Sequence, residues 1–156
     1  MAKNKPKPKN RAVIVNRRAR YDYNLGEELT VGMSLNGKQV RAARDGLVQL
    51  KGSYVTVRAG ELWLSNSSWT LKLNQRGGEE KAVDTEPVKL LATRKQIMGL
   101  MQARQDGNTI AALRLHVAGQ FIKLVVATGK GKKKYDKRET IKRREQAREA
   151  ARSMRS

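Results

Sequence analysis

Apolar and polar residues alternate in short runs through most of the chain between residues 11 and 128. A period of two is typical of strands that bury one face, and the runs are rich in β-branched residues, which favour extended backbone. We therefore predict a mainly β protein of about six strands, at residues 11–16, 21–35, 47–57, 61–65, 109–117 and 120–128.

Glycines mark the connections between these strands. Ala59-Gly60 joins the third and fourth strands, and Ala118-Gly119 joins the last two, each as a tight turn. Gly26 predicts an interruption or a bulge within the second strand. Residues 66–87 are polar and include QRGGEEK, so we expect a long, mobile surface loop there.

Two stretches have the composition and spacing of short helices. Residues 37–46 are bounded by glycines and rich in helix formers, which predicts one or two turns. Thr93 and Gln96 resemble a capping box, and the helix that follows them should end at Asp106-Gly107. This helix is predicted to be short and amphipathic, because residues of one face recur at intervals of three and four, at Ile97, Leu100, Met101 and Arg104.

Every link between successive strands is short or helical, and the chain has no internal repeat. Such links favour a small closed antiparallel barrel of OB type with two or three short helices. A β-sandwich is the alternative that the same strand pattern allows. The barrel is expected over residues 11–128, between a disordered basic arm at 1–10 and a basic tail at 129–156.

Positive charge is concentrated at the two ends of the chain. The whole chain has a formal net charge of +20, from 34 Lys and Arg against 14 Asp and Glu. Residues 1–20 carry eight of these cations and no acid, and residues 129–156 carry 12 cations and four acids. The segment between them keeps a net charge of only +4, as an ordinary globular domain does. Basic arms on such a domain are typical of proteins that bind nucleic-acid phosphates.

The tail that begins at Gly129 has only two large aliphatic side chains. It cannot bury enough surface to offset the entropy of ordering, so we expect it to be disordered when free. The composition of residues 136–155 nevertheless favours helix, with Glu139 placed to pair with Arg143. An RNA that neutralises its charge should therefore fold this segment into a helix about 30 Å long.

The sequence excludes several classes of chemistry. It contains no cysteine, so disulfides and thiolate sites are excluded, and no apolar run approaches the roughly 18 residues of a membrane span. The single histidine, His116, alternates with apolar neighbours in a predicted strand and is interpreted as structural. No phosphate-binding loop, zinc-protease motif or nucleophile elbow occurs. We expect a soluble, cytoplasmic monomer without cofactor, metal, membrane partner or catalytic residue.

Three basic clusters could hold RNA. NRRARYDY, residues 16–23, places arginine forks beside tyrosine rings, which suits phosphate binding and base stacking. Cations spaced by three share one face of the helix at 37–46, and the glycines of GKGKKK, residues 129–134, allow the backbone to approach phosphates closely. The predicted RNA-binding residues are Asn16, Arg17, Arg18, Arg20, Tyr23, Lys38, Arg41, Arg44, Lys130, Lys132 and Lys133.

These motifs occur in the order found in a known family. NRRARYDY, GKQVRAARDG, SYV at residues 53–55 and GKGKKKYDKRETIKRRE together resemble the SsrA-binding proteins, or small protein B, the bacterial partners of transfer-messenger RNA. The resemblance runs from about Ala12 to Met154. Its most specific part is the stretch from Lys132 to Arg138, followed by Ile141-Lys142.

The resemblance implies an OB-type barrel that binds the tRNA-like domain of transfer-messenger RNA and stands in for its missing anticodon arm. It also implies a tail that is unstructured when free and becomes helical in the vacant mRNA channel of a stalled ribosome, near the decoding centre. Such a protein is required for trans-translation and does no chemistry itself. The tail residues expected to bind the ribosome are Lys134, Tyr135, Asp136, Lys137, Arg138, Ile141, Lys142, Arg143, Met154 and Arg155.

The chain departs from the family pattern at four positions. The family usually has histidine where this chain has Tyr21, and often where it has Tyr135; tyrosine can stack on a base but cannot carry a positive charge. Thr30 and Gln39 replace acidic residues of the family. Composition alone equally allows another OB-type ribosome-associated protein, such as a ribosomal protein or an initiation factor, and a nuclease is the enzymatic alternative.

Overall fold

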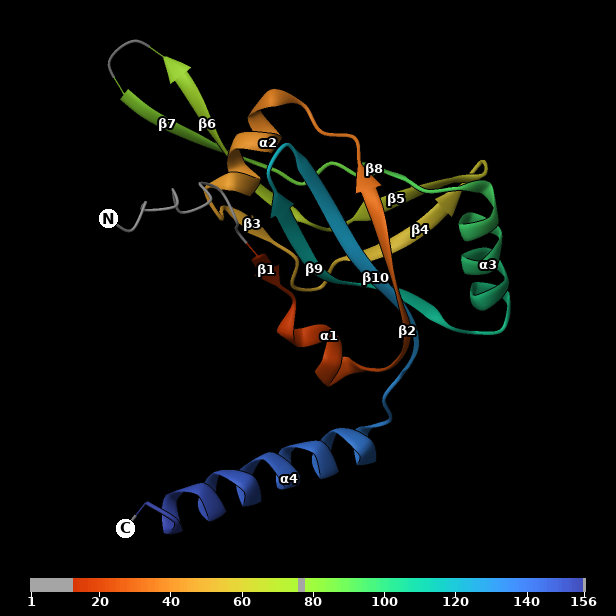
Figure 1. Ribbon diagram of the computed structural model, residues 1–156, viewed down its shortest axis with the longest axis vertical. Coiled ribbons are helices and arrows are strands. Elements are labelled where there is room, and N and C mark those ends of the chain that lie inside the picture. The colour runs from red at the N-terminus through yellow and green to blue at the C-terminus, as the bar shows by residue number, and fades with distance from the viewer. Residues whose placement is uncertain (1–12, 76–77, 156) are drawn as a thin grey trace, which may run out of the picture.

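Strands that lie far apart in the sequence pair to form one strongly curved sheet in the computed structural model (Figure 1). The structure describes residues 13–75 and 78–155, so the basic arm predicted at 1–10 lies outside the described residues. Four helices and ten strands occur in this described part of the chain. In chain order they are β1 (Val13–Val15), α1 (Arg17–Asp22), β2 (Tyr23–Met33), α2 (Gly37–Arg44), β3 (Val48–Gln49), β4 (Tyr54–Arg58), β5 (Glu61–Ser65), β6 (Ser68–Gln75), β7 (Gly78–Asp84), β8 (Val88–Leu91), α3 (Arg94–Gln105), β9 (Thr109–Ala118), β10 (Phe121–Gly131) and α4 (Lys134–Ser153).

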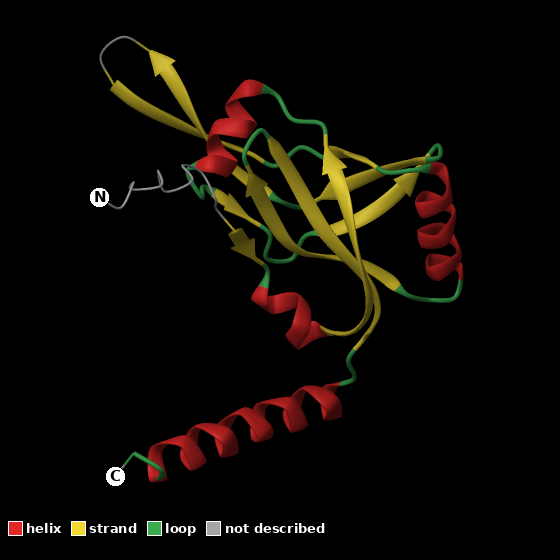
Figure 2. Ribbon diagram, viewed as in Figure 1, coloured by secondary structure: helices red, strands yellow, loops and turns green. Residues whose placement is uncertain are grey.

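Seven strands form the main sheet in the order β1-β9-β10-β2-β8-β5-β4, and all of its pairings are antiparallel. β4 also pairs with β9, through Tyr54 with Ala111 and Val55 with Ile110, so the sheet curls back on itself (Figure 2). β4 has five residues, whereas β9 has ten and pairs with β1 along its other half. The prediction of a mainly β, antiparallel fold is confirmed, but the sheet is barrel-like without closing along its whole length.

The main hydrophobic core fills the inside of this curved sheet. Leu62 and Leu64 of β5 and Leu115 of β9 are fully buried there. Burying such a side chain stabilises the fold by roughly 1.5–3 kcal/mol. The helices α2 and α3 contribute Ala43 and Leu100 to the same core, and this contact holds them against the sheet.

The predicted turn at Ala59-Gly60 and the predicted bulge are confirmed, whereas the turn predicted at Ala118-Gly119 lies one residue later, at Gly119-Gln120, because Ala118 pairs with Phe121. Ala59 and Gly60 have φ values of +50° and +76°, the left-handed pair that a two-residue hairpin between β4 and β5 requires. In β2, Gly26 and Glu27 together face the single residue Thr128 of β10, which is the bulge expected near Gly26. The last hairpin, β9 with β10, is also formed.

Both helices predicted from the sequence are confirmed, and each begins with a capping box. The Asn36 side chain accepts a hydrogen bond from the backbone of Gln39 (2.9 Å), and the Gln39 side chain accepts one from the backbone of Asn36 (3.1 Å). Thr93 and Gln96 make the same reciprocal pair at the start of α3. These bonds satisfy backbone donors that the first helical turn leaves without partners.

The loop predicted at residues 66–87 is wrong, because most of this segment forms the hairpin of β6 and β7. β6 also pairs with β3 to make a second, three-stranded sheet. Trp69 of β6 is fully buried, and its Nε1 donates to Ser67 Oγ (2.9 Å). Because the segment is polar in composition, the sequence did not indicate that Trp69 would be buried and would hold the hairpin against the core. The strand predicted at 47–57 is likewise divided, because Gly52 turns the chain with a φ of +77°.

The strand predicted from residue 21 begins only at Tyr23, because NRRARYDY forms the helix α1. A bulge in β9 provides the seat for this helix: Leu113 is an extra residue between the pairs that Ala112 and Arg114 make with β10. The bulge lets Leu113 join Ala19 of α1 in a small second core on the outer face of β9 and β10. One buried alanine therefore attaches α1 to the sheet.

The C-terminal helix α4 spans twenty residues and has no buried side chain. It extends away from the curved sheet, beside α1 (Figure 1). The predicted helix is confirmed, while its folding only in contact with RNA stays a prediction. None of the helices in the described residues is long and apolar enough to cross a membrane.

Gly129 lies where β10 passes closest to β2. A Cβ atom added there would stand 2.5 Å from the backbone oxygen of Asn24, closer than real contacts allow. We expect Gly129→Ala to lower the free energy of unfolding by about 1–3 kcal/mol, since the backbone must shift to admit the methyl group. Urea denaturation measures this loss. Gly131→Ala is the matched control, because nothing lies within 4 Å of its added Cβ, and an equal loss in both variants would contradict the argument.

Candidate nucleic-acid interface

The tail helix is attached to α1 by a small group of polar contacts. The Asp22 carboxylate binds Arg18 Nε at 3.1 Å and Lys137 Nζ at 3.3 Å, and the Asp22 backbone oxygen accepts a hydrogen bond from Lys132 N (2.7 Å). The same two cations contact the Tyr21 ring, with Arg18 Cζ 5.1 Å and Lys137 Nζ 5.7 Å from the ring centroid. We call Tyr21, Asp22, Lys132 and Lys137 the tail-docking contact.

The residues directly before α4 also hold its first turns in place. Lys132 Nζ lies 3.3 Å from Thr140 Oγ1, which in turn donates to the backbone oxygen of Asp136 (2.9 Å). Lys133 occupies the N-cap position and makes no side-chain cap bond. Lys132 is thus partly engaged in holding the helix, whereas Lys130 and Lys133 are exposed at the end of β10 and beyond it.

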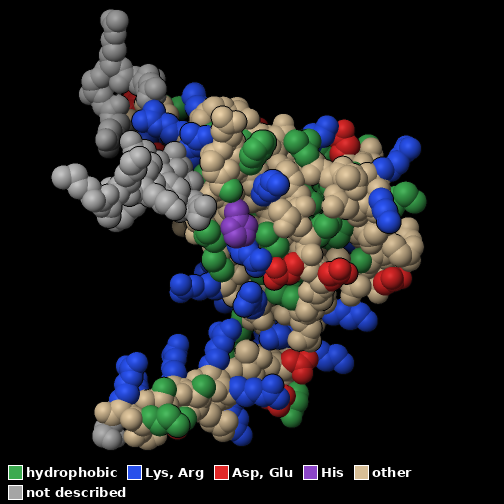
Figure 3. Space-filling view, in the orientation of Figure 1, with side chains coloured by type: hydrophobic (Ala, Val, Ile, Leu, Met, Phe, Trp, Pro, Cys, Tyr) green, Lys and Arg blue, Asp and Glu red, His purple; other side chains and the backbone are tan. Residues whose placement is uncertain are grey.

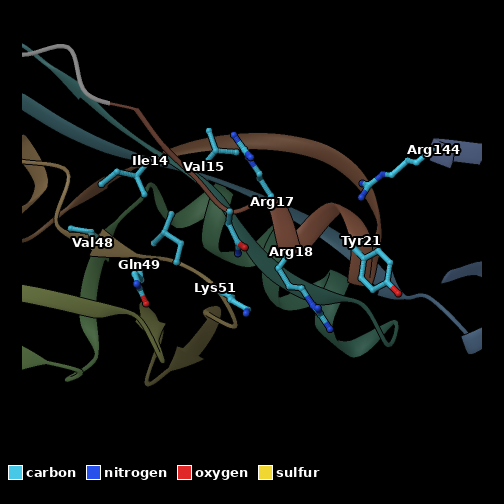
Figure 4. A pocket seen from close by; sticks show the side chains of 11 residues that line it. Ile14, Val15, Arg17, Arg18, Tyr21, Val48, Gln49, Lys51 and Arg144 are labelled. Atoms are coloured by element: carbon cyan, nitrogen blue, oxygen red, sulfur yellow. The ribbon is translucent and has the colours of Figure 1, made fainter. Parts of the chain in front are cut away.

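Two adjoining grooves separate α1 from α4. The larger, of about 700 Å³, has Arg17, Arg18 and Tyr21 on the α1 side and Arg144 on the α4 side (Figure 4). Its remaining lining comes from β1 and from the segment around β3: Ile14, Val15, Asn16, Val48, Gln49, Leu50 and Lys51. Figure 3 shows Lys and Arg side chains on both sides of this hollow. No carboxylate lines the groove among the described residues.

The smaller groove, of about 410 Å³, is lined by five arginines. Arg17 and Arg20 come from α1, Arg114 from β9, and Arg144 and Arg148 from α4. Val15 and Leu113 complete it. Arginine forks bind phosphate oxygens bidentately, so this surface suits a phosphate chain.

Within the described part of the chain, Arg114 is the one arginine of this groove that has a carboxylate partner. Its Nη2 binds Glu28 at 2.8 Å, and its Nε donates to His116 Nε2 at 3.0 Å. The hydrogen bond from Arg114 lowers the pKa of Glu28 from its ordinary value, and the nearby charges of Arg114 and Arg20 act in the same direction. The structural interpretation of His116, in strand β9 and bonded to Arg114, is confirmed.

Asn16 was predicted to contact RNA, but the structure buries it. Its side-chain Nδ2 donates to the backbone oxygen of Ala112 (2.9 Å), and its backbone N donates to the oxygen of Leu113 (2.7 Å). Both acceptors belong to the β9 bulge. Asn16 therefore connects α1 to the sheet, while its contact with RNA stays a prediction. By contrast, Arg17, Arg18 and Arg20 are exposed.

The basic cluster on α2 lies apart from the grooves. Lys38, Arg41 and Arg44 are all exposed, and α2 stands at the end of the curved sheet far from α4 (Figure 1). The opposite side of α2 carries the buried Gln39, whose side-chain Nε2 donates a hydrogen bond to Asp84 Oδ2 of β7 at 3.4 Å. The structure thus divides the predicted RNA-binding residues between two ends of the molecule.

An exposed apolar patch near α2 was not identified from the sequence. Phe121, the only phenylalanine of the chain, is 67% exposed and Leu91 is 53% exposed. They border a hollow of about 210 Å³ with Lys123 and with Val40 of α2. We call Leu91, Phe121 and Lys123 the end patch. The one sign of this patch in the sequence is a phenylalanine that follows a glycine turn. Phe121 was predicted only to lie in the strand at residues 120–128.

The remaining predicted tail residues lie along the exposed surface of α4 and just beyond it. Tyr135 is 75% exposed, Ile141 is 40% exposed and Met154 is 88% exposed. The predicted pair of Glu139 with Arg143 is formed at 3.2 Å. Other members of the set are solvent-exposed as well: Lys134, Arg138, Lys142 and Arg155. In the described parts of the chain, no three His, Asp or Glu side chains come together to hold a metal.

The curved antiparallel sheet, the arginine-lined grooves and the basic helix define a small β-protein of the nucleic-acid-binding class. The family model for the SmpB protein matches residues 13–156. An SsrA-binding protein of Ligilactobacillus salivarius is 37% identical over 153 residues, which cover 97% of each chain, and one of Halalkalibacterium halodurans is 36% identical over 145 residues, 92% of this chain and 93% of that one. The chain belongs to the SmpB family of SsrA-binding proteins.

A solved structure has the same fold. The chain superposes with a TM-score of 0.59 and 27% sequence identity on one from "tmRNA-SmpB: a journey to the center of the bacterial ribosome". The match covers 83% of this chain and 94% of the other. The family resemblance stated from the sequence motifs is confirmed.

Asp22→Asn should loosen the docking of α4 while leaving the sheet intact. A partly exposed ion pair contributes about 0.2–1 kcal/mol, so loss of the bond to Lys137 should raise the undocked fraction by up to about fivefold. The chain has no cysteine, so spin labels at Arg58→Cys and Gln146→Cys report the distance between β4 and α4. We expect Asp22→Asn to broaden the distance distribution.

The matched control is Glu139→Gln, which breaks the ion pair with Arg143 inside α4 and leaves the tail-docking contact in place. It should keep the narrow distribution. An unchanged distribution in Asp22→Asn, or equal broadening in the control, would show that Asp22 does not hold the tail.

Proposed function

We propose that this protein is an RNA-binding protein of trans-translation. Its sheet, with α1 and α2, binds the tRNA-like domain of transfer-messenger RNA, occupies the place of the missing anticodon arm and delivers the RNA to stalled ribosomes. The tail helix α4 enters the vacant mRNA channel near the decoding centre. The protein acts as a monomer in the bacterial cytoplasm and contributes no catalytic group.

The observation that carries this proposal is the division of charge between two separate surfaces on a member of the SmpB family. One surface joins the exposed cations of α2 to the end patch around Phe121. An exposed phenylalanine beside lysine and arginine suits an unpaired base and its phosphate. The other surface joins α1 to α4. Two surfaces at opposite ends can contact two RNA partners at once.

The geometry of α4 supports its role in a channel. A helix of twenty residues reaches about 30 Å, and it has no buried side chain to hold it along the sheet. Among the described residues, the ion pair and the side-chain hydrogen bond that join it to the rest of the protein come from its first turns, at Lys137 and Thr140. The remainder is free to follow a ribosomal surface, with its charge neutralised by RNA.

Another ribosome-associated protein with a similar barrel, such as a ribosomal protein or an initiation factor, was the alternative left by the composition. The family match covers residues 13–156, which includes the sheet and the tail together. Transfer-messenger RNA and the ribosome are the partners named for the solved SmpB structure, and we propose the same partners here. A nuclease is not favoured, since the family is one of RNA-binding proteins.

Truncation after Lys134 tests the division of labour. The shortened chain keeps α1, α2 and the end patch and loses α4 from the second surface. It should bind a transcript of the tRNA-like domain within about threefold of the full chain at raised salt, where the contribution of the tail's charges is screened. It should abolish tagging of stalled products in a reconstituted translation system. Tagging by the truncated chain would contradict the role of the tail.

Ala147→Pro separates helix from charge, because it keeps every cation of the tail and breaks α4 in its interior, at a cost of about 3 kcal/mol. We expect it to lose tagging as the truncation does. Ala147→Ser is the conservative control and should tag normally. Normal tagging by Ala147→Pro would mean that the tail acts through charge without forming this helix.

A further inference from the structure

We propose that α1 and α4 form a two-sided arginine clamp that holds one RNA strand by its phosphate backbone. The clamp consists of Arg17 and Arg20 on one wall, Arg144 and Arg148 on the other, and Arg114 on the floor. It rests on the proposed function only in taking RNA as the partner. It adds that the sheet and the tail act together on the same strand.

The wall on α1 is rigidly placed for so short a helix. Arg17 and Arg20 are three residues apart, so their side chains leave the same face, and both are exposed. Ala19 between them is 3% exposed and packs on the β9 bulge, which Asn16 fixes with two hydrogen bonds. The two guanidinium groups thus start from an anchored backbone.

The wall on α4 is a stripe of cations on one helix face. Lys137, Arg144 and Arg148 recur at intervals of seven and four residues, which 3.6 residues per turn places along one side. The same periodicity places Glu139 and Glu149 on other sides of the helix and Asp136 and Glu145 at the flanks of the stripe. Lys137 begins the stripe and is held to Asp22 and Tyr21, so the tail-docking contact sets the orientation of this face toward α1.

The charges of the clamp are not neutralised within the protein. Among the described residues, no carboxylate lies within ion-pair distance of Arg17, Arg20, Arg144 or Arg148. Glu28 is already bound by Arg114 on the floor. Cations that face one another across a groove repel, so the arrangement is favoured only when an anion lies between them. A chain of phosphates supplies one anion for each nucleotide.

The shape of the site favours a strand over an isolated phosphate. The two grooves share Val15, Arg17 and Arg144, so they adjoin along α1, and we refer to both together as the channel. Arg18 and Lys51 also line the larger groove, so cations continue beyond the five arginines of the smaller one. Cations along two adjoining grooves match the phosphates of a single RNA strand of a few nucleotides.

The test measures binding of a fluorescein-labelled, twelve-nucleotide uridine RNA to the full chain in 0.1 M salt. The variants are Arg17→Gln with Arg20→Gln, Arg144→Gln with Arg148→Gln, and all four together. We expect each pair to weaken binding about tenfold and to reduce the slope of log affinity against log salt by about 1.4, from two contacts at about 0.7 each. Because both walls hold one strand, the quadruple variant should fall short of the hundredfold product.

Arg138→Gln with Lys142→Gln is the matched control, because it removes two charges from another side of the same helix. It should weaken binding no more than about threefold. An effect equal to that of Arg144 and Arg148 would reduce the clamp to general tail charge. A pair variant that lowered the number of RNA strands bound for each protein, and left the affinity of the remaining site unchanged, would mean two independent sites and overturn the proposal. Equal binding of a twelve-residue polyglutamate peptide would indicate a protein partner instead of RNA.

A second measurement does not depend on affinities. Photo-crosslinkers attached at Val15→Cys and at Ala151→Cys, on the two sides of the channel, should mark neighbouring nucleotides of one strand in the tRNA-like domain or in ribosomal RNA, and the strand marked identifies which RNA occupies the clamp. Marks on unrelated strands would overturn the proposal. The uridine RNA has the sequence of neither transfer-messenger RNA nor ribosomal RNA, so its binding tests the clamp alone. A protein that binds this RNA as expected but does not support tagging would refute the proposed function and leave the clamp standing.

Discussion

The position of α1 is the constraint on which the functional surface depends. A helix of six residues is not stable in isolation, and α1 has one buried side chain, Ala19. It is held by the second small core and by the two hydrogen bonds that Asn16 donates to the bulged strand β9. From this seat α1 presents three arginines to solvent and provides Tyr21 and Asp22 for the tail. The bulge in β9 thus determines where the proposed RNA-binding groups of both α1 and the tail lie.

The tail helix α4, unlike α1, is attached to the protein without any buried side chain. α4 has no buried side chain, and partly exposed ion pairs each stabilise a protein by less than about 1 kcal/mol. Its order therefore depends on a few contacts with α1 and on whatever neutralises its charge. Weak docking suits the proposed movement of α4 from α1 to a ribosomal surface. Only a few contacts with α1 would be lost, so a modest free energy of RNA binding would offset them. The basic composition that prevents burial also makes RNA the natural partner.

Much of the fold could be predicted from local chemistry. The capping boxes at Asn36 and Thr93 and the left-handed turn at Ala59-Gly60 each depend on residues within a few positions of one another. α1 could not be predicted, because Ala19 is buried by residues of β9 more than ninety positions away. The hairpin of β6 and β7 was missed for a similar reason: a polar segment is anchored by Trp69, whose burial depends on distant strands.

The candidate site shows the same division. Arg17 and Arg20 were identified from the sequence, whereas Arg114, Arg144 and Arg148 were not. The groove that these five arginines line needs the tail to dock on Asp22, a contact between residues far apart in the sequence. Asn16 was predicted to contact RNA, but its hydrogen bond to the bulge in β9 could not be predicted, because it joins residues 96 positions apart. The central claim is that this one protein joins a tRNA-like RNA to the ribosome. Crosslinking it in living bacterial cells, immunoprecipitating it and sequencing the bound RNA tests that claim most directly. The account predicts transfer-messenger RNA together with ribosomal RNA of the decoding region, whereas recovery of ribosomal RNA alone would contradict it.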